Sequence, residues 1–314
     1  MQTPFFSIVI PTFNQGNLLR KAINSIMNQK FQNFEIIVID NYSKDNTKKI
    51  VKTFKKKKII YKRLKNNGII SKSRNRGIKL SKGKWVAFLD SDDTWSKNKL
   101  EKVHQMIKEK NFEVICNDEW IIKRGGQSRE IWKFGPFKKN FYKYLLEFGN
   151  CLSTSASVVK KSFIKKNNII FSERKDFVTS EDFDFFLKIA KKNGKFFFLH
   201  TPLGEHLFHS KSASSNYLKH KNSWEAVIRH HIFNVQKFNN DKEKAWKAVY
   251  LNFVFKDLIF RLRNNKIKPN LLKEILSFYI FNPILSLILS YKAVVSKIVQ
   301  IYSSKKAIMF PSSI

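Results

Sequence analysis

Three aspartates, Asp90, Asp92 and Asp93, stand within four positions of one another, directly after the apolar run 85–89. The chain has 24 acidic residues against 60 basic ones, so a cluster of carboxylates is unusual for its composition. Hard divalent cations prefer oxygen ligands, and Mg²⁺ commonly binds through one or two carboxylates together with substrate phosphates. The spacing therefore indicates a site where a cation meets a diphosphate and neutralises charge that builds on a leaving group.

A structural alternative exists for the same aspartates, because acidic residues also stabilise the first turn of a helix. In this interpretation Ser91 to Asp93 would cap a helix that begins at about Ser96. The first interpretation requires a ligand site around the aspartates, and the second requires a helix directly after them. The other motifs of the chain are therefore needed to distinguish the two.

Up to residue 118 the chain alternates short apolar runs with longer amphipathic stretches. The runs predict strands at 5–10, 35–40, 58–64, 84–90 and 112–118, and the stretches predict helices at 17–29, 43–54, 71–81 and 97–110. This alternation is typical of an α/β fold, a mostly parallel sheet with helices on both faces. Ligands of such sheets bind beyond the carboxyl ends of the strands, so we expect the polar groups 11–14, 40–41 and 90–93 to meet there.

The chain becomes less regular after residue 118. Gly125 and Gly126 predict a hairpin or loop, and residues 153–164 predict a strand that runs into a helix. Residues 222–314 have apolar clusters and no strand pattern, which predicts helices. We therefore expect an α/β domain over residues 1–220 and a helical region over residues 221–314.

The segment 271–302 is strongly apolar, but its longest uncharged stretch is interrupted by Asn282 and Pro283 and is shorter than the ~20 residues that a membrane-spanning helix needs. Lysines follow at Lys292, Lys297, Lys305 and Lys306. This combination favours amphipathic helices that lie on an anionic membrane surface. The alternative is a helical cap packed on the first domain.

Taken together, the motifs and their order resemble family 2 glycosyltransferases with the GT-A fold. The stretches that carry the resemblance are SIVIPTFNQGNLLRKAINSIMNQKFQNFEIIVIDNYSKDNT, NNGIISKSRNRGI, GKWVAFLDSDD and TSEDFDFFLKIAKKNG. They extend the likeness over roughly residues 1–215. The resemblance implies a Rossmann-like mixed sheet with a helical C-terminal extension. It also implies an inverting transferase that uses a nucleotide-diphosphate sugar.

Nucleotide contacts are implied at the sheet edge, by carrying over the family's motifs to this sequence. The residues concerned are Pro11, Thr12, Phe13, Asn14, Asp40, Asn41, Arg74, Asp90 and Ser91. Asp40 matches the first acid of a pair that reads the base, whereas Asn41 replaces the second acid and leaves the base open. Arg74 would brace the nucleotide side, with a solvated helix face as its alternative role.

The resemblance also implies a metal site and a catalytic base. Asp92 would be the direct ligand of Mn²⁺ or Mg²⁺, and His209 would approach the same metal, although the aromatic-basic pair usual before that histidine is absent. Asp182 would take the proton of the acceptor hydroxyl, and Glu181 would help to position the acceptor. The structural alternative is a capping box from Thr179 to Asp182.

The formal net charge of +36 attracts anions, although an AT-rich coding sequence would also give many lysines. The charge alone supports a nucleic-acid-binding protein without transferase activity. Three aspartates on the binding edge would repel a phosphate backbone, so no nucleic-acid partner is expected. A sugar-nucleotide-synthesising enzyme is disfavoured, because PTFN replaces the Gly-rich, Arg-containing loop of that class.

Cys116 and Cys151 form no disulfide framework, which fits free thiols in the cytosol. The start MQTPFFSIVIP has no basic region and no cleavage site, so no signal peptide is expected. We expect a peripheral enzyme at the cytoplasmic face of the inner membrane. Its donor would be UDP-linked, and its acceptor would be a hydroxyl of a glycan or lipid-linked saccharide. The pathway would build a surface polysaccharide such as lipopolysaccharide, O-antigen or capsule.

Overall fold

The computed structural model describes residues 3–54, 58–123, 129–209 and 216–263. The chain divides into two compact units, Met1–Gln236 and Lys237–Ile314. The division lies after the predicted boundary at 220/221, because the helix at 217–230 packs against elements of the first unit. The separate functions expected of the two regions remain predictions.

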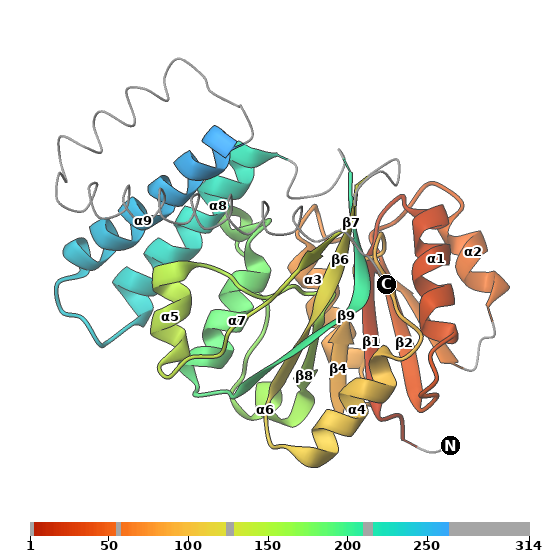
Figure 1. Cartoon of the computed structure of the whole chain (residues 1–314). Coiled ribbons are helices and arrows are strands. Elements are labelled where there is room, and N and C mark those ends of the chain that lie inside the picture. Colours follow the sequence, from red (N-terminus) through yellow and green to blue (C-terminus); the bar gives the residue numbers. More distant parts are fainter. Residues whose placement is uncertain (1–2, 55–57, 124–128, 210–215, 264–314) are drawn as a thin grey trace, which may run out of the picture. The chain divides into compact units, whose positions relative to one another are not determined.

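One mixed sheet forms the centre of the first unit (Figure 1). In the described residues it has nine strands, in the order β3-β2-β1-β4-β8-β6-β9-β5, with β7 paired to β6. The strands are β1 Phe6–Thr12, β2 Phe34–Asp40, β3 Ile59–Arg63, β4 Trp85–Phe88, β5 Thr94–Trp95, β6 Val114–Lys123, β7 Arg129–Trp132, β8 Ser157–Lys160 and β9 Phe196–Phe208. The carboxyl ends of β1, β2 and β4 lie at one edge because these strands run parallel.

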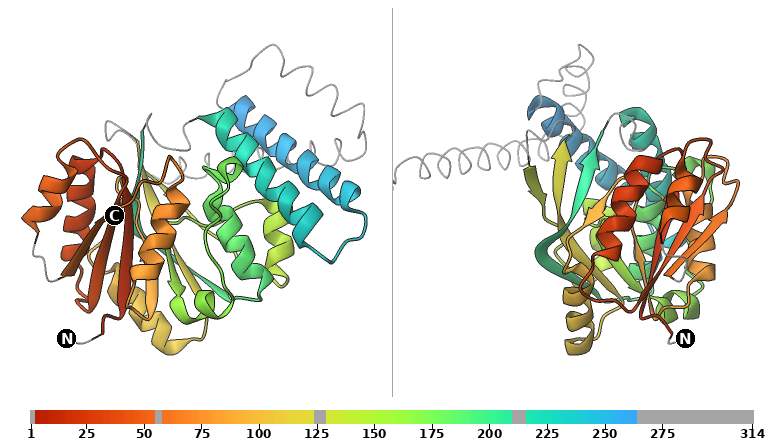
Figure 2. Two further views of the ribbon diagram at one scale, coloured as in Figure 1. Left: turned by 180° about the vertical axis from the view of Figure 1, so that it is seen from behind. Right: turned by 90° about the vertical axis from the view of Figure 1, so that its right-hand side faces the viewer.

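Helices cover both faces of the parallel part of the sheet, as the alternating pattern predicted (Figure 2). Helices α1 Gly16–Met27, α2 Thr47–Thr53 and α4 Lys99–Glu109 lie on one face, and α3 Ile70–Leu80 and α7 Glu181–Lys191 lie on the other. Successive side chains of a strand point to opposite faces, so Ile8 packs with α1 and α4 while Val9 faces α3. Every residue of β1 and β2 is buried, which explains the apolar runs Ile8–Ile10 and Ile36–Ile39 within them.

Close packing places α3 against the sheet. A Cβ atom added to Gly77 would lie 2.2 Å from the Cγ1 atom of Val9, so only glycine allows this approach. The same helix carries Arg74, whose side chain is buried. Because Gly77 lets α3 lie this close to the sheet, the guanidinium of Arg74 lies near the carboxyl ends of the strands.

The prediction of a mostly parallel sheet holds for β3-β2-β1-β4 and for the pairing of β6 with β9, and it is wrong for the other strand pairs. Strand β8 is antiparallel to both β4 and β6, and β5 is antiparallel to β9. The pairing of β6 with β9 is again parallel. Apolar runs report which residues are buried, but they carry no information on strand direction once the regular alternation with helices ends.

The later helices are α5 Phe141–Phe148, α6 Lys161–Lys166, α7, the 3-10 helix η2 Lys175–Phe177, α8 Tyr217–His230, the π-helix η4 His231–Val235 and α9 Lys242–Arg263. The strand and helix predicted at 153–164 are confirmed as β8 and α6. Helical structure after residue 222 is confirmed up to Arg263, and the apolar segment 271–302 lies outside the described residues. Among the helices that are described, none combines the length and apolar character needed to cross a membrane.

Candidate active site

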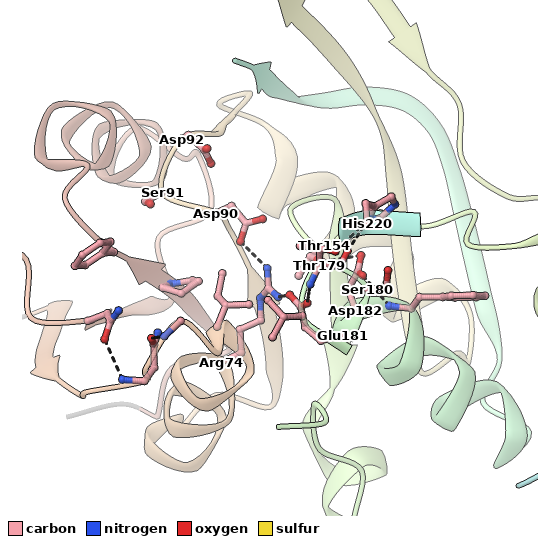
Figure 3. Close-up of a pocket in the computed structure, with 18 of the residues that line it drawn as sticks. Arg74, Asp90, Ser91, Asp92, Thr154, Thr179, Ser180, Glu181, Asp182 and His220 are labelled. Atoms are coloured by element: carbon pink, nitrogen blue, oxygen red, sulfur yellow. Dashed lines mark hydrogen bonds and ion pairs between the residues drawn. The ribbon is translucent and has the colours of Figure 1, made fainter. Parts of the chain in front are cut away.

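A cavity of about 530 Å³ opens at the edge where β1, β2 and β4 end (Figure 3). Ten predicted site residues line it: Pro11, Thr12, Phe13, Asn41, Arg74, Asp90, Ser91, Asp92, Glu181 and Asp182. Asn14, Asp40 and His209 do not line it. The predicted meeting of the strand-end motifs is therefore confirmed, and it includes the distant pair at the start of α7.

Asp40 is fully buried at the end of β2, and protein groups already bind both of its carboxylate oxygens. Its Oδ1 accepts hydrogen bonds from the Ser43 amide at 2.9 Å and the Ser43 hydroxyl at 2.6 Å. Its Oδ2 accepts from the hydroxyl of Tyr61 and lies 3.6 Å from Nε of Arg63. A nucleotide base would have to replace one of these partners to reach the carboxylate.

Asn14 and Asn41 shape the loops around the cavity. Asn14 has a positive φ of 50°, its amide donates to the Ser43 hydroxyl at 2.8 Å, and its side-chain oxygen accepts from the Lys44 amide at 2.8 Å. The Asn41 side-chain oxygen accepts from the Asn66 amide at 2.9 Å. Of the two, only Asn41 borders the cavity, so the departure from the family's acidic pair lies at a position on the cavity wall.

Asp92 lines one end of the cavity and pairs with His209, which lies outside the cavity lining. Nε2 of His209 lies 2.9 Å from Oδ2 of Asp92. Burial, together with the neighbouring Asp93 and Asp90 carboxylates, raises the pKa of Asp92. No cluster of three or more His, Cys, Asp or Glu side chains suited to a metal occurs in the part of the chain that the structure describes. The protein thus offers two candidate ligands here.

Asp93 is held inside the fold, and the helix-cap interpretation of the aspartate cluster is wrong. Helix α4 begins only at Lys99, and no side chain caps it. The Asp93 carboxylate instead accepts hydrogen bonds from the Ser155 hydroxyl at 2.6 Å and the Leu207 amide at 3.0 Å. It also lies 3.2 Å from Nδ1 of His206. Burial alone would lower the pKa of His206, but Asp93 raises it to about 9.

Arg74 joins the two acidic groups across the cavity, and Figure 3 shows its side chain between them. Nη1 lies 2.6 Å from Oε1 of Glu181, and Nη2 lies 2.8 Å from Oδ1 of Asp90. The arginine side chain is only 4% exposed. Burial by itself would lower the pKa of Arg74, but the two carboxylates more than offset it and keep the guanidinium charged. One buried cation therefore fixes both groups relative to each other.

Asp182 is half-buried in the first turn of α7. Its Oδ1 accepts from the Phe183 amide at 2.8 Å, while Oδ2 has only long contacts, 3.3 Å to Nδ2 of Asn150 and 3.4 Å to Oγ1 of Thr154. Burial and then the Glu181 charge raise the pKa of Asp182 to about 6, although Arg74 opposes the shift. Such a carboxylate is ionised at neutral pH and basic enough to take a proton.

The predicted capping box from Thr179 to Asp182 is not formed. Helix α7 begins at Glu181, its N-cap is Ser180, and no side chain provides a cap hydrogen bond. The Glu181 Oε2 atom accepts from the Thr179 amide at 2.8 Å. The carboxylates at this helix start are therefore directed to the cavity and to Arg74.

Several cavity residues were not among the predicted site residues. They are Gln15, Asn66, Asn150, Thr154, His206, Lys219, His220 and Trp224. Gln15 and Asn66 stand inside the quoted motifs, which could have indicated them. Asn150 and Thr154 come from the irregular segment before β8, and Lys219, His220 and Trp224 come from α8. No quoted motif includes these last five residues, because only the tertiary fold brings their segments to the strand ends.

Comparison with known proteins gives a family match over much of the first unit. A family model described as "Glycosyl transferase family 2" matches residues 7–166. The poly(ribitol-phosphate) beta-N-acetylglucosaminyltransferase TarP of Staphylococcus aureus is 34% identical over 220 residues, which is 68% of this chain and 65% of TarP. The putative teichuronic acid biosynthesis glycosyltransferase TuaG of Bacillus subtilis is 25% identical over 225 residues, or 70% of this chain and 86% of TuaG.

The likeness extends to solved structures. The crystal structure of S. aureus TarS 1–349 in complex with UDP-GlcNAc matches with a TM-score of 0.63 and 22% identity, over 79% of this chain and 72% of that one. This confirms the GT-A-like mixed sheet that the sequence predicted. Against three other curated relatives the chain spans only 20% to 30% of their length, and against TarP it spans 65%.

Proposed function

Because the chain belongs to glycosyl transferase family 2, we propose that it transfers a sugar from a UDP-linked donor to a hydroxyl group, with inversion at the anomeric carbon. One observation carries the proposal. The half-buried Asp182, with its pKa raised to about 6, shares one cavity with Asp90 and Asp92 at the strand ends. A base and a diphosphate-facing acidic group are the two parts that such a transfer requires.

In the proposed reaction the acceptor oxygen attacks the anomeric carbon from the face opposite the diphosphate. The bond between that carbon and the diphosphate oxygen breaks, and UDP leaves with the electron pair. Asp182 takes the proton of the attacking hydroxyl, so the products are the glycoside, UDP and a protonated carboxyl. Glu181, fixed by Arg74, orients the acceptor beside the base.

Divalent metal is part of the proposal, with Asp92 and His209 as the residues that would hold Mn²⁺ or Mg²⁺. The donor set fits such an ion, because a carboxylate and an imidazole nitrogen leave further positions to phosphate oxygens. The neighbouring Asp93 and Asp90 carboxylates, whose charge adds to the effect of burial in raising the pKa of Asp92, would also favour a bound cation. When bound, the ion would neutralise charge on the departing diphosphate.

We further propose an acceptor on a surface polysaccharide and a place of action at a cytoplasmic membrane surface. TarP is named for poly(ribitol-phosphate) and TuaG for teichuronic acid, which supports a glycopolymer rather than a small molecule. The net charge of +36 and the apolar, lysine-flanked segment 271–302 support contact with anionic lipid. Lipopolysaccharide, O-antigen and capsule belong to the same proposed class.

The test is UDP release from a panel of UDP-sugars, starting with UDP-GlcNAc, in the presence of Mn²⁺ or Mg²⁺. We expect release that chelation by EDTA abolishes and that metal restores. Binding to random DNA is measured in parallel over a salt series, because the high charge makes nucleic acid the competing partner. Metal-independent DNA binding with a steep salt dependence, and no UDP release, would contradict the transferase proposal.

A further inference from the structure

Thr179, two residues before the acidic pair Glu181 and Asp182 of α7, has an unusual backbone conformation. Its φ is +90°, a value that a β-branched residue rarely adopts, and such strain persists only where neighbouring groups hold it. Two groups do so here: Glu181 Oε2 accepts from the Thr179 amide at 2.8 Å, and the Thr179 carbonyl lies 3.0 Å from Nδ1 of His220 (Figure 3). The turn that presents Glu181 and Asp182 is therefore held from α8.

The hydrogen bond to Thr179 also determines the state of the His220 ring. A carbonyl oxygen can only accept, so Nδ1 must carry the proton of this bond. Burial lowers the pKa of His220, which keeps the ring neutral near pH 7. A neutral ring with its proton on Nδ1 has a bare lone pair on Nε2.

That lone pair belongs to a residue on the cavity wall. His220 lines the same cavity as Asp182, and no residue within the described ranges hydrogen bonds to its Nε2. An unprotonated imidazole nitrogen accepts a hydrogen bond from a hydroxyl or amide donor. Next to a base that receives one hydroxyl proton, a fixed acceptor is suited to a second hydroxyl of the same molecule.

We propose that His220 is an acceptor-binding residue: Nε2 accepts a hydrogen bond from a hydroxyl adjacent to the attacking one, while Nδ1 holds the Thr179 turn in place. The ligand class is a molecule with neighbouring hydroxyls, such as a sugar or polyol. This inference rests on the proposed function, since it names how the same cavity selects its acceptor.

The experiment compares two probe acceptors in the full-length chain with UDP-GlcNAc and Mn²⁺. Ribitol offers neighbouring hydroxyls, whereas 1,5-pentanediol keeps the two terminal hydroxyls and lacks the others. We expect the wild-type chain to glycosylate ribitol roughly tenfold faster than pentanediol, the effect of one useful hydrogen bond. His220→Asn keeps a donor at the place of Nδ1 but loses the acceptor at Nε2, so this ratio should fall to about one.

His220→Gln provides the complementary change, because its amide reaches the place of Nε2 but leaves Thr179 without its donor. We expect it to keep the ribitol preference and to lower the rate with both probes. A purely structural histidine would give the same pattern in both variants. The matched control is His104→Asn in α4, where the ring packs against Phe5 and Phe31, and it should leave the ratio unchanged.

Three results would contradict a proposal, and they distinguish the role of His220 from the proposed function. A wild-type chain without preference for ribitol, or a His220→Asn variant that retains the preference, would refute the role of His220. Absence of UDP release from the wild-type chain with every UDP-sugar would instead refute the proposed function. Thermal unfolding of each variant shows whether it is folded when the ratio is measured.

Discussion

The site has two acidic groups, which differ in how strongly other protein groups bind their carboxylate oxygens. The first group is Asp90, Asp92 and Asp93 after β4, and the second is Glu181 and Asp182 at the start of α7. In the first group, Asp93 is held by three protein donors, Asp90 by Arg74, and Asp92 by His209. In the second group, Asp182 Oδ2 has only contacts of 3.3 Å and longer. A fixed set of negative charges is suited to binding a cation and a diphosphate, whereas a loosely bonded oxygen is available to a proton.

The largest expected effect is on the second group. Asp182→Asn keeps the size of the side chain but removes its basicity, so transfer should fall by roughly 10³-fold, as for loss of a general base. The measurement is the steady-state rate of UDP release. Transfer at the wild-type rate would show that the base is another residue.

Arg74 tests the connection between the two groups. Arg74→Met leaves the Asp90 and Glu181 carboxylates without their buried cation, and the free energy of unfolding should fall by about 3 kcal/mol. The matched control is Arg174→Met, because Arg174 pairs with Asp176 at a similar distance but at the surface. That change should cost less than about 1 kcal/mol in urea unfolding. Equal losses of unfolding free energy in the two variants would contradict the assignment of Arg74 as the link between the two acidic groups.

Asp93 tests whether the first group contains a purely structural member. Asp93→Asn replaces one acceptor oxygen by an amide, which cannot accept from both the Ser155 hydroxyl and the Leu207 amide. The free energy of unfolding should fall by about 1–3 kcal/mol, the cost of an unsatisfied buried group. Chemical denaturation measures it, and an unchanged midpoint would contradict the assignment.

The smallest effect is expected on the pH dependence of kcat/KM, which distinguishes a carboxylate with a raised pKa from one with an ordinary pKa. The pKa of Asp182 is raised to about 6, and only its ionised form can accept the acceptor proton. Activity should therefore be constant above that pH and fall about tenfold for each pH unit below it. An acid limb near pH 4 would indicate a carboxylate whose pKa is not raised.

The sequence predicted the parallel half of the sheet well because its strands are buried on both faces. The runs Ile8–Ile10 and Ile36–Ile39 contain only apolar residues, and glycine or polar turns separate the strands from the helices. The motifs at the strand ends then had to meet, since parallel strands share an edge. The antiparallel half was not predictable in this way, because apolar runs carry no information on strand direction where the regular alternation of strands and helices ends.

The site was predictable where residues lie in motifs and not where folding brings single residues together. Asp92 and Asp182 stand in recognisable groups, whereas Asn150 and His220 stand in none. Asp40 shows the opposite limit: its position at the strand end was right, but Ser43 and Tyr61 occupy its oxygens. A sequence pattern indicates which residue reaches the edge, and only the packing shows which atoms remain open.

Binding of UDP, measured by calorimetry with and without Mn²⁺, tests the division of labour most directly. We expect Asp92→Ala to lose the part of the UDP affinity that depends on Mn²⁺, and Asp182→Asn to bind UDP as the wild-type chain does. Both variants reach the same cavity, so a general loss of its shape would affect both alike. Equal loss in the two variants, or full Mn²⁺-dependent binding by Asp92→Ala, would contradict separate roles for the two acidic groups.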